Sequence, residues 1–456
     1  MSEIGPSHPH TYRKELVAPL FELIKAYESC VIIGAASMGK SRLIQFILRP
    51  DIQQHYMSDE AQRHLLIWVD CNRMNQAGND WSLYELILTG LTESIGDMPA
   101  HVSVRERLLA LRKELILEPN ALYAQRTLEL AVHMLIREHN LQLCIILDEF
   151  DDSYKKLPAQ ALANLRALRD MHKYKLSYTL FMRDHPANLR STEEKDVEGF
   201  YEKISRSVLG LTPYNKDDTI RIIDQIAERR HSTIPLTTET KDTLVCLSGG
   251  HPGLLENLMD SLIRSQPMGM TWEEWLQDQP NLEQECDRIW LGLRPEEQQT
   301  LNHIANDIST GFRERDLLLT KGLIKSAGER EYAIFSPIFH QYAANKYPVQ
   351  SEQDKQQVRV DTQAGLVYIN NQQTEPLTPK EYSLLEALYE HAGEICSSEL
   401  LIKRLYPEHE QLHVNENNIT TLIRRIRKKI EPNSSRPQYL VNVKGRGYRL
   451  VVSPGG

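Results

Sequence analysis

The chain has 456 residues, a formal net charge of −9, and 41% hydrophobic and 25% charged residues. This length excludes a single compact domain and predicts roughly three domains of ordinary globular composition. No apolar run approaches the roughly 20 residues of a membrane-spanning helix, and the N-terminal residues MSEIGPSHPHTYRKEL lack the apolar core of a signal peptide. We therefore expect a cytoplasmic protein without a membrane partner.

The cysteine and histidine patterns predict neither disulfides nor a transition-metal site. The six cysteines are scattered without CxxC spacing, mostly in apolar surroundings, and the 16 histidines form no HExxH or similar pattern. Such cysteines are typical of small buried side chains in a reducing compartment.

The apolar patterning divides the chain into a series of domains. Residues 1–212 alternate short apolar runs with helical patterns, which is typical of a three-layer α/β domain with a parallel sheet. Residues 213–270 have helical apolar spacing, and residues 271–347 predict helices followed by a short strand pair. The polar, proline-containing segment 348–357 predicts a linker. Residues 358–456 begin with strands, continue with helices and end in the hairpin QYLVNVKGRGYRLVV. The candidate strands of the first domain are SCVIIG, LLIWVD, LCIILD and LSYTLFM.

The stretch VIIGAASMGKS, residues 31–41, has the form of a phosphate-binding loop that follows a strand and opens a helix. Glycines let the backbone approach phosphate oxygens, and loop amides and the helix N-terminus attract them. Lys40 would reach the β- and γ-phosphates, and Ser41 would ligate Mg²⁺. The alternative is a glycine-rich turn that binds nothing. The predicted nucleotide contacts are Gly34, Ala35, Ala36, Ser37, Met38, Gly39, Lys40, Ser41 and Arg42.

Two acidic residues end the strand LCIILDEFDD and supply the second half of such a site. Asp148 could hold Mg²⁺ through water, and Glu149 could orient the attacking water. An acidic loop that caps the strand is the alternative, and Glu149 could also serve mainly in switching. The two motifs together predict nucleotide binding, with slow hydrolysis used for switching.

With these motifs and the later strand LSYTLFMRDHP, the chain resembles the ATPase core of the AAA+ and STAND classes. The resemblance implies ATP or ADP as cofactor. It places Arg183 where a sensor residue reads the γ-phosphate; the alternative is an ordinary surface arginine.

The stretch LSGGHPGLL resembles the GxP motif of STAND proteins, with Gly250, His251 and Pro252 at the three positions. This implies a helical lid over the nucleotide, with His251 and Pro252 near it. A helix N-terminal turn without a ligand is the alternative. The arginine that AAA+ proteins usually carry at the start of the lid helix is missing, which favours STAND. The block from IWLGLRPEEQQTL to EYAIFSPIFHQYA resembles the winged helix that follows the STAND lid, and it has no basic helix to bind DNA.

The C-terminal block is basic although the whole chain is acidic. Between Ile423 and Arg449, nine basic residues stand against one acid, Glu431, which leaves a local charge of +8. Local charge governs attraction to phosphates. The stretches LTPKEYSLLEALYEHAGEICSSELLIKRLYP, NNITTLIRRIRKKIEP and YLVNVKGRGYRL resemble the winged helix-turn-helix of OmpR/PhoB-type response regulators.

This resemblance implies a recognition helix for double-stranded DNA and a wing around residues 444–447. The apolar residues of NNITTLIRRIRKKI recur at helical spacing and form one face, which leaves basic side chains on other faces. A solvated helix without a partner, or a wing used for protein contacts, is the alternative. The family commonly has Asp-Val-His-Ile where this chain has Thr-Thr-Leu-Ile at 420–423, so the base contacts stay open. The predicted DNA contacts are Thr420, Thr421, Arg424, Arg425, Arg427, Lys428, Lys444 and Arg446.

The expected protein is multidomain: a P-loop NTPase with a helical lid, a winged helix and an OmpR/PhoB-type DNA-binding domain. We expect an ATP-dependent switch that regulates bacterial transcription and forms homo-oligomers with ATP; a signal protein or ligand that activates it is not identified by the sequence. Neither a receiver domain nor a ligand-sensing repeat domain is found in the sequence. A DNA-tethered ATPase of transposition or anti-phage defence, or a signalling scaffold with a protein-docking tail, are the alternatives.

Overall fold

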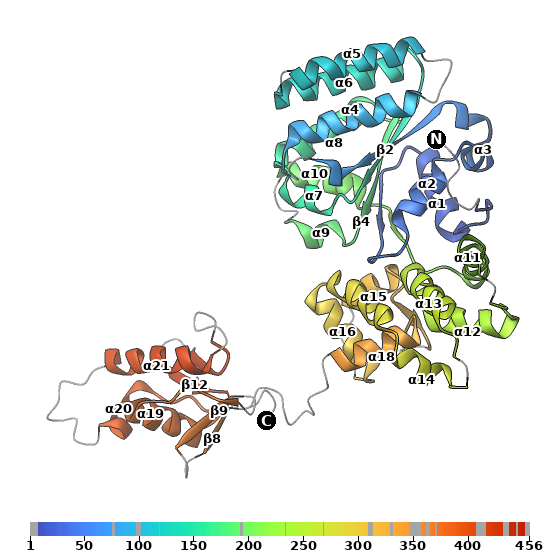
Figure 1. Ribbon diagram of the computed structural model, residues 1–456. Coiled ribbons are helices and arrows are strands. Elements are labelled where there is room, and N and C mark those ends of the chain that lie inside the picture. The colour runs from blue at the N-terminus through green and yellow to red at the C-terminus, as the bar shows by residue number, and fades with distance from the viewer. Residues whose placement is uncertain are drawn as a thin grey trace. The chain divides into compact units, whose positions relative to one another are not determined.

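The computed structural model divides the chain into two compact units, residues 1–346 and 347–456, which are described separately (Figure 1). All six cysteines are free thiols, and no described helix is long and apolar enough to span a membrane. The predicted domain boundaries at 212/213 and 270/271 fall inside the first unit and stay predictions. The structure describes residues 8–74, 78–96, 102–117, 119–191, 195–232, 234–267, 269–308, 313–328, 332–346, 358–361, 365–369, 372–406, 416–431, 437–443 and 446–451.

A five-stranded parallel sheet in the order β2-β3-β4-β1-β5 forms the centre of the N-terminal unit. The four predicted strands are confirmed, and β5 was not predicted. Strands β1 and β4 are buried along their whole length, as expected for a parallel sheet with helices on both faces. The strands are β1 (Cys30–Ile33), β2 (His64–Asp70), β3 (Gln142–Asp148), β4 (Leu176–Met182) and β5 (Val208–Gly210).

The strand register brings the ends of β1, β3 and β4 to one edge of the sheet. Ile33 pairs with Met182, and Asp70 pairs with Asp148. The segments that follow these strands carry the loop motif, Glu149 and Arg183, so the sheet places all three parts of the predicted site at its carboxyl edge.

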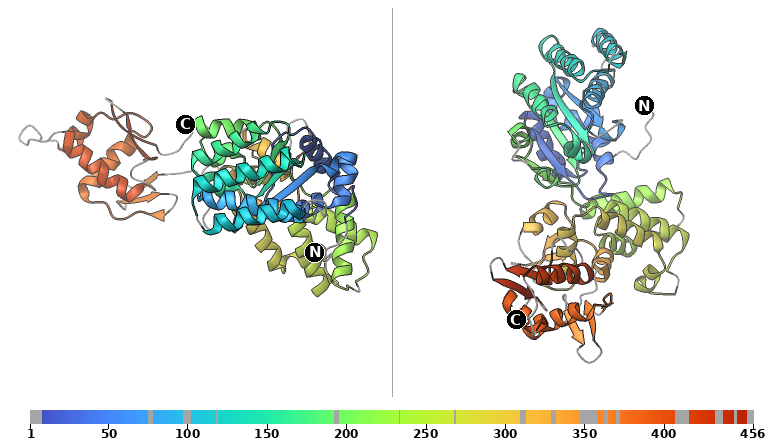
Figure 2. Two further views of the ribbon diagram at one scale, coloured as in Figure 1. Left: turned by 90° about the horizontal axis from the view of Figure 1, so that it is seen from above. Right: turned by 90° about the vertical axis from the view of Figure 1, so that its left-hand side faces the viewer.

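Helices cover the sheet on two sides and build two separate hydrophobic cores (Figures 1 and 2). Alternate residues of β1 point to opposite faces, with Ile32 in one core and Val31 and Ile33 in the other. The helices of this part are α1 (Lys14–Lys25), α2 (Lys40–Ile47), α3 (Pro50–Met57), η1 (Ser58–Gln62), η2 (Cys71–Arg73), α4 (Asp80–Gly96), α5 (Val102–Leu117), α6 (Ala121–Arg137), α7 (Asp151–Lys156), α8 (Ala159–Met171), α9 (Pro186–Leu189) and α10 (Lys195–Ile204).

The remaining helices of the N-terminal unit share one continuous core with α1 to α3. They comprise the helices of residues 213–270, which are predicted to form a lid and are called the lid here, and then a block with the element order of a winged helix, called here the first winged-helix block (residues 271–346). The elements are α11 (Lys216–Arg229), α12 (Thr238–Ser248), α13 (Pro252–Arg264), α14 (Trp272–Gln277), α15 (Pro280–Leu291), α16 (Pro295–Ala305), α17 (Arg313–Thr320), β6 (Ile324–Ser326), β7 (Tyr332–Ile334) and α18 (Pro337–Lys346).

A cluster of four charged side chains, of which Lys321, Glu297 and Asp184 are buried and Arg294 is partly exposed, joins this block to the sheet. Lys321 Nζ lies 2.7 Å from Glu297 Oε1, and these side chains are 1% and 0% exposed. Arg294 Nε lies 3.0 Å from a carboxylate oxygen of Asp184, which Lys321 also approaches at 4.0 Å. Two positive and two negative charges balance, as burial of ions requires. The block is thereby fixed to the end of β4, next to Arg183.

The C-terminal unit has the elements of a winged helix: a three-stranded antiparallel sheet, three helices and a terminal hairpin. The predicted apolar face of the last helix is confirmed, because Ile419, Leu422, Ile423, Ile426 and Ile430 are all buried in the core of this unit. The elements are β8 (Val358–Asp361), β9 (Leu366–Ile369), β10 (Gln372–Gln373), α19 (Pro379–Glu390), α20 (Ser398–Leu405), α21 (Glu416–Ile430), β11 (Leu440–Val443) and β12 (Gly447–Leu450).

Replacing Lys321 with methionine should destabilise the N-terminal unit strongly, because the fully buried Glu297 then loses its 2.7 Å ion pair and keeps only Arg294, whose Nε lies 3.6 Å from Glu297 Oε2. We expect a loss of about 3–5 kcal/mol in the free energy of unfolding, measured by chemical denaturation. The double variant Lys321→Met/Glu297→Gln should recover much of that loss. Lys216→Met is the matched control, because Lys216 pairs with Asp242 on the surface, with 63% of its side chain exposed. An equal effect of both single variants would contradict a special role of the buried cluster.

Candidate functional site

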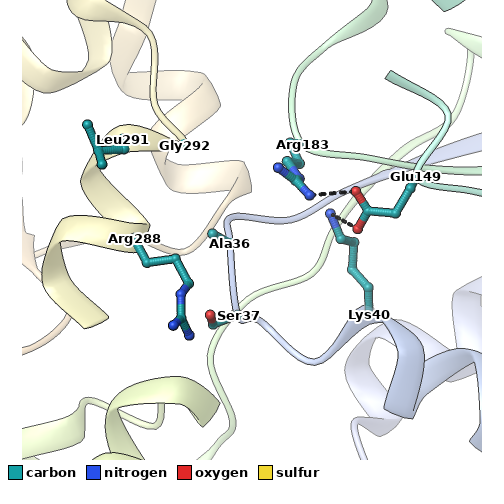
Figure 3. Close-up of a pocket in the computed structure, with 8 residues that line it drawn as sticks. All are labelled: Ala36, Ser37, Lys40, Glu149, Arg183, Arg288, Leu291 and Gly292. Atoms are coloured by element: carbon teal, nitrogen blue, oxygen red, sulfur yellow. Dashed lines mark hydrogen bonds and ion pairs between the residues drawn. The ribbon is translucent and has the colours of Figure 1, made fainter. Parts of the chain in front are cut away.

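A cavity of about 390 Å³ lies at the carboxyl edge of the sheet, between the β1–α2 loop and α15 (Figure 3). Three basic side chains converge on it. Lys40 and Arg183 belong to the predicted site, whereas Arg288 was not singled out from the sequence. The lining residues are Ala36, Ser37, Lys40, Glu149, Arg183, Arg288, Leu291 and Gly292.

The backbone of the loop has the form that a phosphate cradle needs. Gly39 has φ +84° and precedes the first residue of α2, and Ser37 also has a positive φ, +55°. A Cβ at Gly34 would lie 2.9 Å from Leu211 Cβ, so this position needs a glycine. The N-terminus of α2 begins at Lys40, where a helix attracts anions. Ala35 and Met38 pack into the core, and Ser41 is exposed.

Two side chains bind the loop from the side that faces the lid and the N-terminal segment. His251 Nε2 lies 3.2 Å from the carbonyl oxygen of Ala36, and Arg13 Nη2 donates to the carbonyl oxygen of Met38 at 2.8 Å. The amide of Leu254 donates to His251 Nδ1, so Nε2 carries the hydrogen. Burial, with a smaller contribution from nearby Arg13, lowers the pKa of His251 to about 3. Arg13 belongs to no recognisable motif, so its role could not be predicted from the sequence.

The lid meets the loop through the predicted GxP residues. Gly250 has φ +79°, and a Cβ there would lie 2.2 Å from the carbonyl oxygen of Tyr214. Pro252 starts α13, and its Cγ would lie 3.7 Å from a Cβ built on Gly39. Arg42 Nη2 lies 2.9 Å from Glu256 Oε1 on α13. The structure therefore brings His251, Pro252 and Arg42 together at the contact between loop and lid.

Glu149 bridges two cations of the cavity, Lys40 and Arg183 (Figure 3). Its oxygens lie 3.2 Å from Lys40 Nζ and 2.7 Å from Arg183 Nη2. Burial acts to raise the pKa of Glu149, but Lys40 and Arg183 outweigh it and hold that pKa below its usual value. Asp148 is 4% exposed, and burial together with the Glu149 charge raises its pKa to about 6. Asp151 accepts hydrogen bonds from the amides of Arg183 and Asp184, which ties the start of α7 to the end of β4.

The residues present fit a phosphate group. Lys40 Nζ is buried, and its ion pair with Glu149 lacks the geometry of a hydrogen bond, so this cation has donors to offer an anion. Ser41 and Asp148 are the oxygen donors that would hold Mg²⁺ together with phosphate oxygens, which is the usual coordination of that ion. No group of three or more potential metal ligands occurs among the described residues, so the phosphates would have to supply part of any such coordination.

The second candidate site is the exposed side of α21. Thr420, Thr421, Arg424, Arg425 and Lys428 are exposed on this helix, and Arg446 is exposed at the hairpin. Thr420 Oγ1 also lies 3.3 Å from the Tyr448 hydroxyl. Lys444 lies outside the described residues.

Arg427 does not join this exposed set. Its side chain is half-buried, and its Nε donates to the carbonyl oxygen of Leu440 at 2.9 Å. The contact gives Arg427 a structural role between α21 and the hairpin. The helical pattern alone could not separate it from its exposed neighbours.

The one acid of the basic segment is used inside the fold. The carboxylate of Glu431 accepts hydrogen bonds from the amides of Gln438, Tyr439 and Leu440, at 2.6, 3.0 and 2.7 Å. Glu431 is 9% exposed. Its charge is therefore directed at backbone donors, and the exposed side of α21 keeps its positive charge.

We expect His251 to make the stability of the N-terminal unit depend on pH. The folded state keeps His251 neutral down to about pH 3, whereas an unfolded histidine takes up a proton near 6.5. Between these values the unfolded state binds more protons, so the free energy of unfolding rises with pH, by up to about 1.4 kcal/mol per pH unit. Calorimetric melting of wild type and His251→Gln between pH 5 and 7.5 should show a shallower dependence in the variant. His8, whose pKa burial lowers to about 4, keeps a residual slope in both, and equal slopes would contradict the assignment.

Comparison with known proteins separates the two units. Residues 372–450 match the family model "Transcriptional regulatory protein, C terminal". Over 83 residues the chain is 37% identical to the regulatory protein VanR of Enterococcus faecium. The matched region covers 18% of this chain and 35% of VanR. The chain thus spans about a third of the length of this curated relative.

The N-terminal unit is similar to solved structures at low sequence identity. The Walker-type ATPase paby2304 of Pyrococcus abyssi is 16% identical, covers 74% of this chain and 99% of its own, and has a TM-score of 0.46. The ORC2 protein of Aeropyrum pernix, solved as ADPNP–ADP complexes, is 15% identical, covers 76% of this chain and 96% of its own, and has a TM-score of 0.43. The parallel sheet, the loop and the Asp148–Glu149 strand end give this unit the fold of a P-loop NTPase, and it is joined to a C-terminal winged helix of the OmpR/PhoB transcription-regulator type.

Proposed function

We propose that this protein is an ATP-responsive switch of the STAND kind that controls DNA binding by its C-terminal winged helix, and so regulates transcription. The observation that carries the proposal is the cavity behind the loop, where Lys40, Arg183 and Arg288 converge. Each of these cations lies against a carboxylate, Glu149 or Glu285. A phosphate group would compete with these carboxylates for the same donors.

This competition accounts for switching and for slow hydrolysis together. Phosphate oxygens that bind Lys40 and Arg183 release Glu149 from its ion pairs, because charge-assisted hydrogen bonds to phosphate are strong. Only then can Glu149 orient a water molecule toward the terminal phosphate. Ser41 and Asp148 would hold the Mg²⁺ ion that accompanies ATP. Turnover then follows a rearrangement of charges, which suits a switch better than a motor.

The lid contacts favour a STAND-like arrangement. His251 forms a hydrogen bond with the loop carbonyl of Ala36, and Pro252 packs near Gly39. A movement of the lid helix α13 without the loop would therefore break these contacts. The ion pairs of Arg294 and Lys321 with Asp184 attach the first winged-helix block to the same edge of the sheet. ATP binding would alter these contacts and favour oligomers, in which several C-terminal units bind repeated DNA sites. Linking such modules raises affinity by roughly 10²–10⁴ without new contacts.

Replacing Lys40 with alanine should weaken binding of both ATP and ADP, roughly tenfold to hundredfold, because the charge-assisted contact to the β-phosphate is lost. Isothermal titration calorimetry on the full chain with Mg²⁺ measures this directly. Lys216→Ala, on the surface of α11, should bind like the wild type. Unchanged affinity in Lys40→Ala would refute the nucleotide site.

Removing Arg424 and Arg425 together should weaken DNA binding and flatten its dependence on salt. The slope of log K against log[salt] is negative, and each lost phosphate contact reduces its magnitude by about 0.9. Fluorescence anisotropy with duplex DNA, at salt concentrations from about 50 to about 300 mM, measures the affinity and its dependence on salt. Arg404→Ala is the control in the same unit, since Arg404 is paired with Glu390.

The same proteins distinguish a regulator from a DNA-tethered ATPase. A regulator should footprint on direct repeats, more strongly with a non-hydrolysable ATP analogue. DNA-stimulated ATP turnover with little sequence preference would favour the tethered ATPase instead, and an unchanged salt slope in the double variant would refute DNA binding through α21.

A further inference from the structure

Helix α15 of the first winged-helix block places a basic side chain in the nucleotide cavity. Arg288 lines this cavity together with Lys40 and Arg183, which belong to the sheet's own loops. Its side chain is 64% exposed, so it can change partners without unpacking the core. In Figure 3 it extends toward the loop at Ser37. The cavity therefore has a cation that comes from outside the P-loop fold.

The partner of Arg288 is a buried carboxylate three residues earlier on the same helix. Glu285 Oε2 accepts a hydrogen bond from Arg288 Nη1 at 2.8 Å, and the Glu285 side chain is 2% exposed. Glu285 Oε1 is buried without a hydrogen-bond partner of normal geometry among the described residues. Burial raises the pKa of Glu285, and Ser37 of the loop offsets only part of that shift. The carboxylate is thus buried beside the phosphate loop with Arg288 as its ion-pair partner.

Glu285 also touches the first turn of the lid helix. A Cβ added at Gly253, in α13, would lie 2.1 Å from Glu285 Oε1 and 2.8 Å from Ser37 Cβ. The phosphate loop, the lid and α15 therefore meet at one point, and only a glycine at 253 leaves room for the carboxylate. A change in the ion-pair partner of Glu285 would therefore alter contacts of the phosphate loop, the lid helix α13 and α15.

We propose, on the basis of the nucleotide site proposed above, that Arg288 binds the terminal phosphate of a nucleoside triphosphate and that Glu285 competes with this phosphate for it. Lys40 reaches the β- and γ-phosphates of a nucleotide in such a loop. Arg288 lines the same cavity as Arg183 and Glu149 and enters it from the opposite side, next to Ser37 (Figure 3). A terminal phosphate bound between these two sides would meet Arg288 as well as Arg183. A diphosphate lacks that group and leaves the Glu285–Arg288 pair intact.

The competition makes the site selective for a triphosphate and couples it to α15. A phosphate near Arg288 attracts the guanidinium and repels the Glu285 carboxylate. Glu285 is then a buried carboxylate without a cation, which is a strongly unfavourable arrangement. Binding of a triphosphate therefore favours a displacement of α15 from the loop, whereas a diphosphate stabilises the arrangement seen here.

The test compares affinities for ADP and for a non-hydrolysable ATP analogue, measured by calorimetry on the full chain with Mg²⁺. In Arg288→Ala the analogue should bind roughly tenfold to hundredfold more weakly, because a charge-assisted contact is lost, while ADP affinity should change by less than about threefold. Arg288→Lys should recover part of the loss. Equal weakening for both nucleotides, or none for the analogue, would overturn the proposal.

Glu285→Gln gives an independent reading, because it removes the competing charge and keeps the size of the side chain. The analogue should bind more tightly to this variant than to the wild type; unchanged or weaker binding would overturn the competition. The matched control is Arg126→Ala, since Arg126 forms the same kind of pair three residues apart, with Glu129 at 2.7 Å on α6. It should change neither affinity, and a shift in the affinity ratio there equal to that in Arg288→Ala would overturn the assignment.

The nucleotide site itself is tested separately by Lys40→Ala, which should lose both nucleotides. If the wild type binds neither nucleotide, the proposed function fails. If both nucleotides bind and the ratio of their affinities is the same in Arg288→Ala as in the wild type, the nucleotide site stands and the role of Arg288 is refuted. Thermal melting without nucleotide identifies a variant that does not fold, and the Arg288→Lys and Glu285→Gln proteins then decide the question.

Discussion

Two main-chain carbonyl groups of the β1–α2 loop are bound from outside the cavity, and the geometry of the nucleotide site depends on these two hydrogen bonds. His251 holds the carbonyl of Ala36 and Arg13 holds that of Met38. In a planar trans peptide the carbonyl and the next amide point in opposite directions. Fixing the two oxygens outward therefore turns the amides of Ser37 and Gly39 toward the cavity, where they can donate to phosphate. The loop is shaped by its surroundings as much as by its glycines.

The two donors tie this shape to distant parts of the chain. His251 immediately precedes the lid helix α13 and is held neutral by complete burial. Arg13 precedes α1 and also stacks over the Tyr214 ring at 4.2 Å, while its amide donates to Asp218 of the lid. A shift of the lid would remove both supports of the loop at once. In the proposed switch, phosphate binding and lid position would be one equilibrium, which a ligand that prefers one form shifts by its difference in affinity.

The parts of the site that could be predicted from the sequence are those set by local pattern. The loop, the strand end at Asp148 and the lid motif at His251 each lie in one short segment, and parallel strands must end at one edge. Strand β5 escaped prediction because it has only three residues, Val208–Gly210, too few to show a period.

Partnerships across the fold could not be predicted, because they depend on which surfaces meet. The pairing of Glu285 with Arg288 fits helical spacing, yet its place beside Ser37 is a tertiary fact. In the same way Arg424 and Arg427 occupy one helix with equal charge, and only the packing of the hairpin directs the latter to Leu440. The residue types of both sites could therefore be predicted from the sequence more fully than the tertiary contacts that position them.

Helix α15 links the cavity to α18, the last helix of the N-terminal unit. Arg288 lines the cavity, while the neighbouring Asp287 accepts hydrogen bonds from Tyr342 and from Lys346, the last residue of α18. Successive residues of a helix lie about 100° apart around its axis, so a rotation of α15 that moves Arg288 also moves Asp287. The N-terminal unit ends at Lys346. If the proposed function holds, a change at the phosphates would move Asp287 and its contacts with Tyr342 and Lys346 of α18, without any rearrangement of the sheet.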